Sequence, residues 1–248
     1  MNILFVGDIV GRPGRASVAR WLPELCRTRQ IDLVAANGEN AAGGIGATPE
    51  TLVELRELGV MAFTMGNHVW PKKSLAPALP SIPGLVRPAN LPPGVPGQGA
   101  TLLALKDGRK VGLLNLLGRV YMEPVDCPFR AADREIEALR RHTPHILVDI
   151  HAEATSEKVA IGWYLDGRCS AVAGTHTHVQ TGDEWIMPKG TAYITDVGMC
   201  GPYHSVIGVE TGRVIKRFTT GMPQSFQVAK GPLIFCAILI ETDDATGL

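Results

Sequence analysis

The chain has 248 residues and a mass of 26.5 kDa, and its 24 basic and 24 acidic side chains give a formal net charge of zero. Hydrophobic residues make up 45% and charged residues 19%, which is typical of a globular protein and excludes a disordered one. Because no net positive charge attracts a polyanion, we expect neither stable nucleic-acid binding nor binding to an anionic membrane. Chemistry on a phosphate would therefore depend on local positive charge, such as a metal ion.

The cysteines and the apolar runs predict a cytoplasmic protein without a membrane helix. The five cysteines are far apart and form no CxxC pair; they are Cys26, Cys127, Cys169, Cys200 and Cys236. Their odd number favours buried free thiols and a cytoplasmic protein. The longest apolar run, 232–240, is far shorter than the roughly 20 residues that a membrane helix needs.

The first third of the chain alternates between predicted strands and helices. Short apolar runs predict strands at 3–6, 32–36 and 60–65, and helical spacing of apolar residues predicts helices at 15–29 and 48–59. Thr48 and Pro49 are typical of a helix start, and Gly59 of a helix end. This alternation predicts a parallel sheet with right-handed crossovers.

The rest of the chain adds a hairpin and further strands. The step Asp107-Gly108 predicts a hairpin between 102–105 and 111–117. Helices are expected at 133–141 and 156–165, and strands at 146–150, 171–173, 185–187, 192–194, 206–209, 214–218 and 233–240. No linker or repeat divides the chain. We therefore expect one α/β domain over residues 1–248, with a mixed sheet, or two sheets packed between helices.

Oxygen and imidazole donors follow five of the predicted strands. They are Asp8, Glu39, Asn40, Asn67, His68, His151, His176 and His178. Because the carboxyl ends of the strands of an α/β sheet collect binding sites, we expect these side chains to lie close together. Mixed oxygen and imidazole donors suit Fe, Mn or Zn better than Mg or Ca. Without His68 the seven others are too many for one tetrahedral ion, which favours two ions that share a carboxylate.

Each donor has an alternative interpretation. Asp8 could cap the helix that follows it, and Asn40 and Asn67 could occupy turn positions with positive φ. His151 could be a hydrogen-bonded core histidine. His176 and His178 are two residues apart after a strand and should project to one side. A metal site explains all five strand ends at once, whereas the alternatives explain them singly.

The ordered motifs resemble those of the calcineurin-like metallophosphoesterases. They are Gly7-Asp8, Gly66-Asn67-His68, His151 and Gly174-Thr175-His176-Thr177-His178. The segments 1–12, 37–40, 151–158 and 201–203 are similar to one branch, the YmdB-like 2′,3′-cyclic-nucleotide 2′-phosphodiesterases. The usual Asp-x-His opening is absent, since Ile9 and Val10 follow Asp8, and Glu39 stands where an aspartate is usual. The resemblance implies a layered α/β/β/α fold with mixed central sheets between helices.

The resemblance also implies roles for the donors. Asp8, Asn40 and His178 would complete one metal site, and Asn67, His151 and His176 the other. Glu39 would bridge the two ions, which would be iron first of all, or manganese or zinc. His68 would act as the general acid. Glu153, Thr155, Ser156 and Asp196 lie near these motifs and could support the imidazoles.

The activity implied by the resemblance is hydrolysis of 2′,3′-cyclic nucleotides to 3′-nucleotides, with a hydroxide between the two metals as the nucleophile. Other small phosphodiesters would also be substrates. The resemblance implies a homo-oligomer, and a tetramer is the form expected. Two alternatives stay open: a metal-dependent phosphomonoesterase or protein phosphatase, and a metal-stabilised nucleotide-binding regulator with little turnover. The presence of His68 favours an enzyme, because binding alone needs no proton donor.

Overall fold

A computed structural model describes all 248 residues and contains two large sheets. The first sheet has the order β13-β1-β3-β4. Its strands are β1 (Asn2–Val6), β3 (Leu33–Asn37), β4 (Ala62–Thr64) and β13 (Ala237–Glu241). The first three are parallel, and β13 runs antiparallel to β1 at the edge. The parallel part is the strand–helix alternation that the sequence predicts.

The second sheet has the order β5-β6-β7-β8-β10-β9. Its strands are β5 (Ala100–Ala104), β6 (Lys110–Leu117), β7 (Ile146–His151), β8 (Ala171–Thr175), β10 (Ala192–Ile194) and β9 (Trp185–Ile186). The hairpin of β5 and β6 turns at Asp107-Gly108, as predicted. The strands β6, β7, β8 and β10 are parallel, so their carboxyl ends share one edge.

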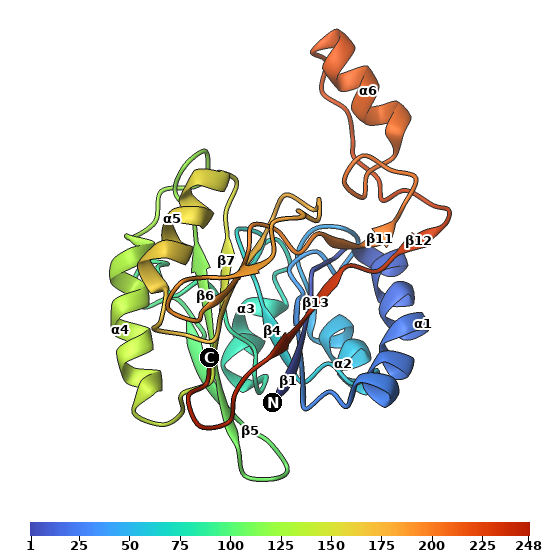
Figure 1. The fold of residues 1–248 in the computed structure, drawn as a ribbon. Coiled ribbons are helices and arrows are strands. Elements are labelled where there is room, and N and C mark those ends of the chain that lie inside the picture. Colours follow the sequence, from blue (N-terminus) through green and yellow to red (C-terminus); the bar gives the residue numbers. More distant parts are fainter.

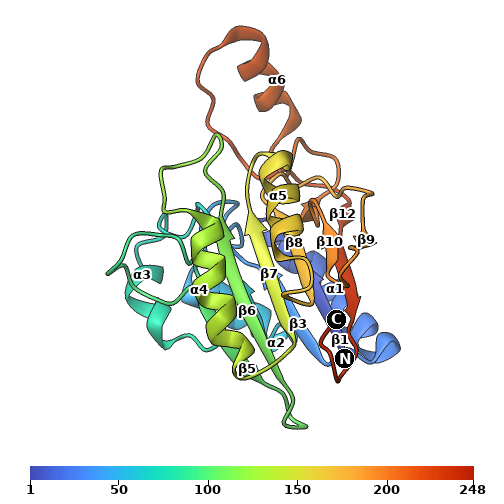
Figure 2. The same ribbon diagram turned by 60° about the vertical axis from the view of Figure 1, so that its left-hand side comes forward.

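Helices cover the outer faces of the two sheets, and Figures 1 and 2 show them on opposite sides of the molecule. Helices α1 (Gly11–Arg29) and α2 (Pro49–Glu57) cover the first sheet, and α4 (Pro128–Arg140) and α5 (Thr155–Leu165) cover the second. The short helices α3 (Leu75–Ala78) and η1 (Leu79–Ser81) follow β4. Thr48 caps α2 through a reciprocal bond pair with Thr51, which confirms the predicted helix start.

The alternation of side chains along each strand builds three hydrophobic layers. In β1, Leu4 and Val6 pack against α1 and α2, whereas Ile3 and Phe5 face the second sheet. In β7, Leu147 lies between the sheets, while its neighbours pack against α4 and α5. The order of layers is helix, sheet, sheet, helix. The predicted α/β/β/α fold is therefore confirmed.

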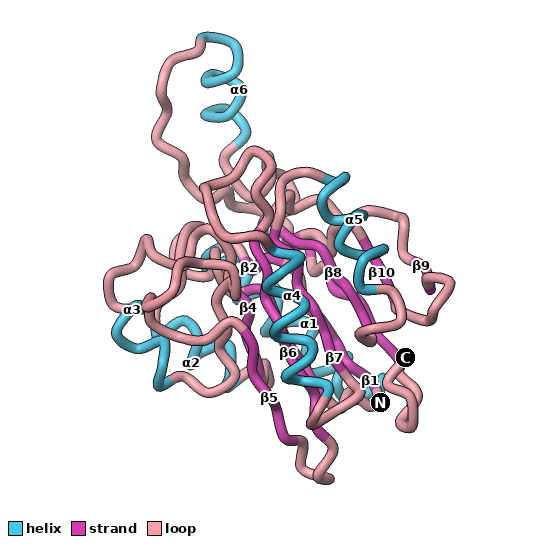
Figure 3. The backbone as a smooth tube through the Cα atoms, turned by 90° about the vertical axis from the view of Figure 1, so that its left-hand side faces the viewer, coloured by secondary structure: helices cyan, strands magenta, loops and turns pink.

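A third, small sheet carries a projecting segment. It contains β2 (Asp8–Ile9), β11 (Met199–Pro202) and β12 (Leu233–Ile234). Between β11 and β12, residues 203–232 leave the body of the protein and include helix α6 (Thr211–Thr220); we call this segment the arm (Figures 1 and 3).

The arm and its surroundings differ most from the sequence predictions. Residues 214–218 are predicted to form a strand because Val, Ile and Phe favour strands, but they lie in α6, so this prediction is wrong. Helical spacing of Val214 and Phe218 and a left-handed Gly221 after the last turn explain the helix. The predicted strand at 206–209 is a turn closed by one isolated bridge, and the run 233–240 is divided between β12 and β13.

The cysteines agree with the expected free thiols but not all with the expected burial. All five are free; Cys169, Cys200 and Cys236 are buried, but Cys26 and Cys127 are only half-buried, contrary to the expectation that all are buried. No helix is both long enough and apolar enough to cross a membrane.

Candidate metal centre

All eight predicted donors meet where strands of the two large sheets end. Asp8 lies in β2, and Glu39 and Asn40 follow β3. Asn67 and His68 follow β4, His151 ends β7, and the loop after β8 carries His176 and His178. The carboxyl ends of β3, β4, β7 and β8 thus bring together residues that are far apart in the chain.

Three donors form one group around Asp8. The Asn40 Nδ2 atom lies 3.4 Å from Asp8 Oδ1 and 3.2 Å from His178 Nε2. His178 Nε2 lies 3.6 Å from Asp8 Oδ1. The Nδ1 atom of His178 faces the carbonyl oxygen of Ile207 at 2.9 Å, which leaves Nε2 as the nitrogen directed at the group.

Three other donors form a second group around His151. Its Nε2 atom lies 3.1 Å from Asn67 Oδ1 and 3.0 Å from His176 Nδ1. The Nε2 atom of His176 lies 3.1 Å from a carboxylate oxygen of Glu153. The rings of His151 and His176 are arranged edge to face, with centroids 4.7 Å apart.

Glu39 lies between the two groups. Its Oε1 atom is 3.1 Å from His151 Nε2 and 3.4 Å from Asn40 Nδ2. Its Oε2 atom accepts the backbone N–H of His68 at 2.9 Å. The side chain is fully buried, and a β-carbon at Gly66 would overlap both this carboxylate and the His151 ring. Only glycine at that position leaves room for the group.

His68 approaches both Glu39 and Asn40. Its Nδ1 atom lies 3.0 Å from Asn40 Oδ1 and 3.3 Å from Glu39 Oε1. Its Nε2 atom makes no hydrogen bond within the protein, and about a third of the side chain (32%) is exposed. His68 therefore has one nitrogen held by the centre and the other free to meet a bound molecule.

The buried charges shift one another's pKa values. Burial alone would raise the pKa of Glu39, but the charge and hydrogen bond of His151, together with His68, lower it well below its usual value. Burial opposes protonation of His151, yet Glu39 and Asp8 raise its pKa to about 9. Burial and the neighbouring His151 charge lower the pKa of His176 to about 4. Two carboxylates are thus buried together with imidazoles, and no Lys or Arg contacts Glu39 or Asp8.

The loop that carries His176 and His178 is strained and firmly anchored. Both histidines have positive φ, at 99° and 65°, which for a residue other than glycine costs on the order of 1–3 kcal/mol. Between them, Thr177 donates its N–H and hydroxyl to Asp196 Oδ2 at 3.1 and 2.7 Å. Lys158 pairs with the same oxygen at 2.7 Å, and both charges are buried. This buried ion pair offsets the strain and holds the two imidazoles in place.

A further layer of buried polar residues orients the donors from behind. Thr175 Oγ1 lies 2.8 Å from His151 Nδ1 and donates to Asp149 Oδ1 at 2.7 Å. The other Asp149 oxygen accepts from Asn37 Nδ2 at 3.2 Å, and Asn37 Oδ1 accepts the Glu39 N–H at 3.1 Å. One carboxylate thereby fixes both His151 and Glu39.

Asn37, Asp149 and Thr175 are not among the donors that the sequence predicts. Asp149 lies inside a buried strand, and Asn37 and Thr175 are the last residues of theirs. Of the four supporting residues that the motifs suggest, Glu153 contacts His176 and Asp196 anchors Thr177. The other two, Thr155 and Ser156, begin α5 and form no side-chain hydrogen bond with a donor.

The structure contradicts the alternative interpretations of Asp8, Asn40 and Asn67, but not the one of His151. Helix α1 has Val10 as its N-cap residue and no side-chain cap, so Asp8 does not cap it. Asn40 and Asn67 do not have positive φ. His151 is hydrogen-bonded and fully buried, but its Nε2 faces three other donors rather than apolar side chains.

The donor set fits metal ions. Glu39, His151 and His176 each offer a ligand atom, and these atoms lie within 4.8 Å of one another. Two buried carboxylates, Asp8 and Glu39, face imidazole and amide groups and have no cationic Lys or Arg partner, an arrangement that a cation would neutralise. Carboxylate and imidazole ligands are typical of Fe, Mn and Zn sites.

A family model described as "YmdB-like protein" matches residues 4–248. The chain belongs to the YmdB-like family. This match spans nearly the whole chain and confirms the resemblance that the sequence motifs indicate.

Relatives of the YmdB-like chain agree with this assignment. It is 49% identical over 246 residues to a 2′,3′-cyclic-nucleotide 2′-phosphodiesterase of Bacillus subtilis strain 168, covering 99% of this chain and 93% of the relative. A solved structure of a phosphatase from Mycoplasma pneumoniae has a TM-score of 0.93 and 37% identity, with 100% of this chain and 89% of that one covered. The crystal structure of a hypothetical protein from Thermus thermophilus has a TM-score of 0.91 and 47% identity, covering 96% of this chain and 92% of that one.

Proposed function

We propose that this YmdB-like chain is a metal-dependent phosphodiesterase that hydrolyses 2′,3′-cyclic nucleotides to 3′-nucleotides. The observation that carries the proposal is the position of Glu39 between two groups of donors, each of which contains at least one imidazole and one oxygen donor. A carboxylate shared in this way is typical of two-metal hydrolytic sites. The name of the Bacillus relative supports the choice of substrate.

The residues that would hold two metal ions follow from the two groups. Asp8, Asn40 and His178 would hold one ion, Asn67, His151 and His176 the other, and Glu39 both. When bound, such ions lower the pKa of a water and neutralise charge that develops on a phosphodiester. Iron is the metal we favour, with manganese or zinc as substitutes, because amide and carboxylate oxygens accompany the imidazoles.

His68 would supply the proton that the departing sugar oxygen needs. Its Nδ1 is held by Asn40 and Glu39, so that its free Nε2 is the atom from which a proton would be donated. The Asp149–Thr175 pair would keep His151 in the tautomer with the proton on Nδ1, which directs the lone pair of Nε2 toward the centre.

Turnover measurements test the proposed function. The protein purified without chelator should convert 2′,3′-cAMP to 3′-AMP, and removal of metal by a chelator should abolish the reaction until iron, manganese or zinc is restored. A phosphomonoesterase would instead release phosphate from 3′-AMP faster than it opens the cyclic diester. Tight binding of 2′,3′-cAMP without product would favour the nucleotide-binding regulator.

We also propose that the chain forms a homo-oligomer, with a tetramer as the expected form, and the arm supports this. Val214 is the only buried residue of α6, whereas Ile215, Phe218 and Met222 are exposed on a segment that projects from the body (Figure 3). Exposed apolar side chains gathered in this way mark interaction surfaces. Light scattering should give a mass above 26.5 kDa that Phe218→Asp lowers; a monomeric wild-type protein would contradict the proposal.

The compartment follows from the thiols. We propose a cytoplasmic location, which is supported by five free cysteines and by the absence of any disulfide among them.

A further inference from the structure

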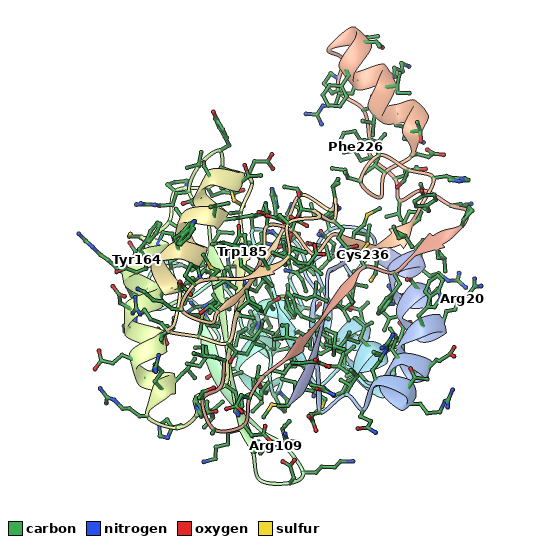
Figure 4. The ribbon with its side chains drawn as sticks, in the orientation of Figure 1. Arg20, Arg109, Tyr164, Trp185, Phe226 and Cys236 are labelled. Carbon is green, nitrogen blue, oxygen red and sulfur yellow. The ribbon has the colours of Figure 1, made fainter.

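A small cavity adjoins the proposed metal centre. It has a volume of about 310 Å³ and is lined by two of the donors, Asn67 and His176, and by Tyr121, Met122 and Glu123. A larger cavity of about 650 Å³ lies between β10 and β13, where Trp185 lines it (Figure 4), but it includes none of the donors. A substrate whose phosphate reaches the donors would therefore extend along the loop that carries Tyr121.

The base of this loop is rigid. Gly118 donates its N–H to the carbonyl oxygen of His151 at 3.0 Å. The buried Glu157 carboxylate accepts the backbone N–H groups of Arg119 and Val120 at 2.9 to 3.1 Å. The loop is thus anchored to the backbone of His151, a proposed metal ligand, and to the Glu157 carboxylate, which has no other hydrogen-bond partner.

Tyr121 has an unusual conformation at the tip of this anchored segment. Its φ is 61°, in the left-handed region that side-chain-bearing residues rarely adopt, and its side chain is 91% exposed. An aromatic ring exposed to this extent contributes almost nothing to folding. A strained residue that presents an apolar ring beside a cleft suggests a binding role.

We propose that Tyr121 is the platform on which the base of the nucleotide stacks. The inference rests on the proposed function and adds the part of the site that recognises the nucleoside. Every nucleobase has a π-face, so an aromatic ring binds bases with little regard to sequence.

The residues that line the cavity favour the same orientation of the substrate. Its inner end is formed by the amide of Asn67 and the imidazole of His176, next to the centre that would bind the phosphate. At its outer end the Glu123 carboxylate repels an anion but tolerates an uncharged base. The anionic end of a cyclic nucleotide therefore belongs at the donors, and the neutral end belongs at Tyr121.

Substitution of Tyr121 by Asn tests the proposal, because Asn tolerates a left-handed φ and removes only the ring. We expect Tyr121→Asn to raise KM for 2′,3′-cAMP about 10-fold, within the range that loss of one stacked base produces, with unchanged metal content and Tm. Tyr121→Phe should keep the wild-type KM. Val120→Ala, a neighbour on the same loop without a ring, serves as the matched control and should change nothing.

A base-free substrate separates this inference from the proposed function. Methyl riboside 2′,3′-cyclic phosphate has the same reacting group, so its KM should be equal for wild type and Tyr121→Asn. A binding titration with 3′-AMP should show the same loss of affinity without turnover. Equal KM and 3′-AMP affinity in both proteins would overturn the role of Tyr121 while hydrolysis stands. If wild type hydrolyses neither diester, the proposed function fails, and loss of 3′-AMP binding in the variant still supports a base platform.

Discussion

Replacing Glu39 by Gln is expected to remove metal from both halves of the centre and to abolish phosphodiester hydrolysis. The reason is the position of the side chain: its Oε1 lies 3.1 Å from His151 and 3.4 Å from Asn40, which belong to different donor groups. A neutral amide has one oxygen donor and no charge, so it cannot serve two cations at once. The substitution keeps the size of the side chain and should leave the fold intact.

Metal content and thermal unfolding together measure this effect. Two equivalents of metal are expected in the wild type and none in Glu39→Gln. Each metal at 100 times its Kd stabilises the folded state by about 2.7 kcal/mol, which is roughly 5–10 °C in Tm for a chain of this size, so two metals should give about twice this gap. The wild type should show this gap between its metal-loaded and metal-free forms, and the variant should not.

A comparison with Asp8 tests whether the effect of Glu39 comes from its position between the two metal sites. The side chain of Asp8 contacts donor side chains of only one group, Asn40 and His178. Its link to the other group is through the backbone alone, because Asp8 Oδ2 accepts the N–H of His176 at 3.2 Å. We therefore expect Asp8→Asn to lose about one equivalent of metal and to keep part of the Tm gap. Glu57→Gln, at the end of α2, is the control with the same chemical change. If Glu39→Gln retained two equivalents, the bridging role of Glu39 would be excluded.

The sequence could predict which residues meet because of a simple property of parallel sheets. The donors lie at or just after strand ends. The strands β3 and β4 are parallel in one sheet and β7 and β8 in the other, so Glu39 and His151 are expected at carboxyl ends of strands. Their approach in the structure agrees with that prediction, whereas their roles as metal ligands stay a prediction. The distances between donors, and the contacts of Glu39 with both groups, depend on loop geometry that the spacing of residues in the sequence does not determine.

The residues behind the donors could not be predicted in the same way. Asp149 lies within β7, where the run of buried neighbours hides a polar side chain. Asn37 and Thr175 are the last residues of β3 and β8, and their position in the sequence does not show that both contact Asp149. Their partners come from different strands, so no local pattern indicates the network. Helix α6 escapes prediction for the opposite reason: its β-branched residues favour a strand, and nothing in the body of the protein packs against most of it.

His68→Ala is expected to lower kcat for 2′,3′-cAMP by about 10²–10⁴-fold while both metals stay bound. This is the usual contribution of a general acid, and the free Nε2 of His68 is the only imidazole nitrogen of the centre without a partner in the protein. The variant leaves all seven proposed metal ligands in place. Its metal content should therefore equal that of the wild type.

The leaving group distinguishes an acid from other roles. A nitrophenyl phosphodiester releases an oxygen that hardly needs a proton, so His68→Ala should slow its hydrolysis far less than that of 2′,3′-cAMP. An equal loss on both substrates would show that His68 binds phosphate or orients water through its contacts with Asn40 and Glu39. Loss of metal in the variant would show that His68 is a metal ligand. This is the strongest alternative to the acid role, because His68 Nδ1 lies 3.3 Å from Glu39 Oε1. Only a loss of activity that depends on the leaving group, with both metals retained, shows that His68 donates the proton to the leaving oxygen.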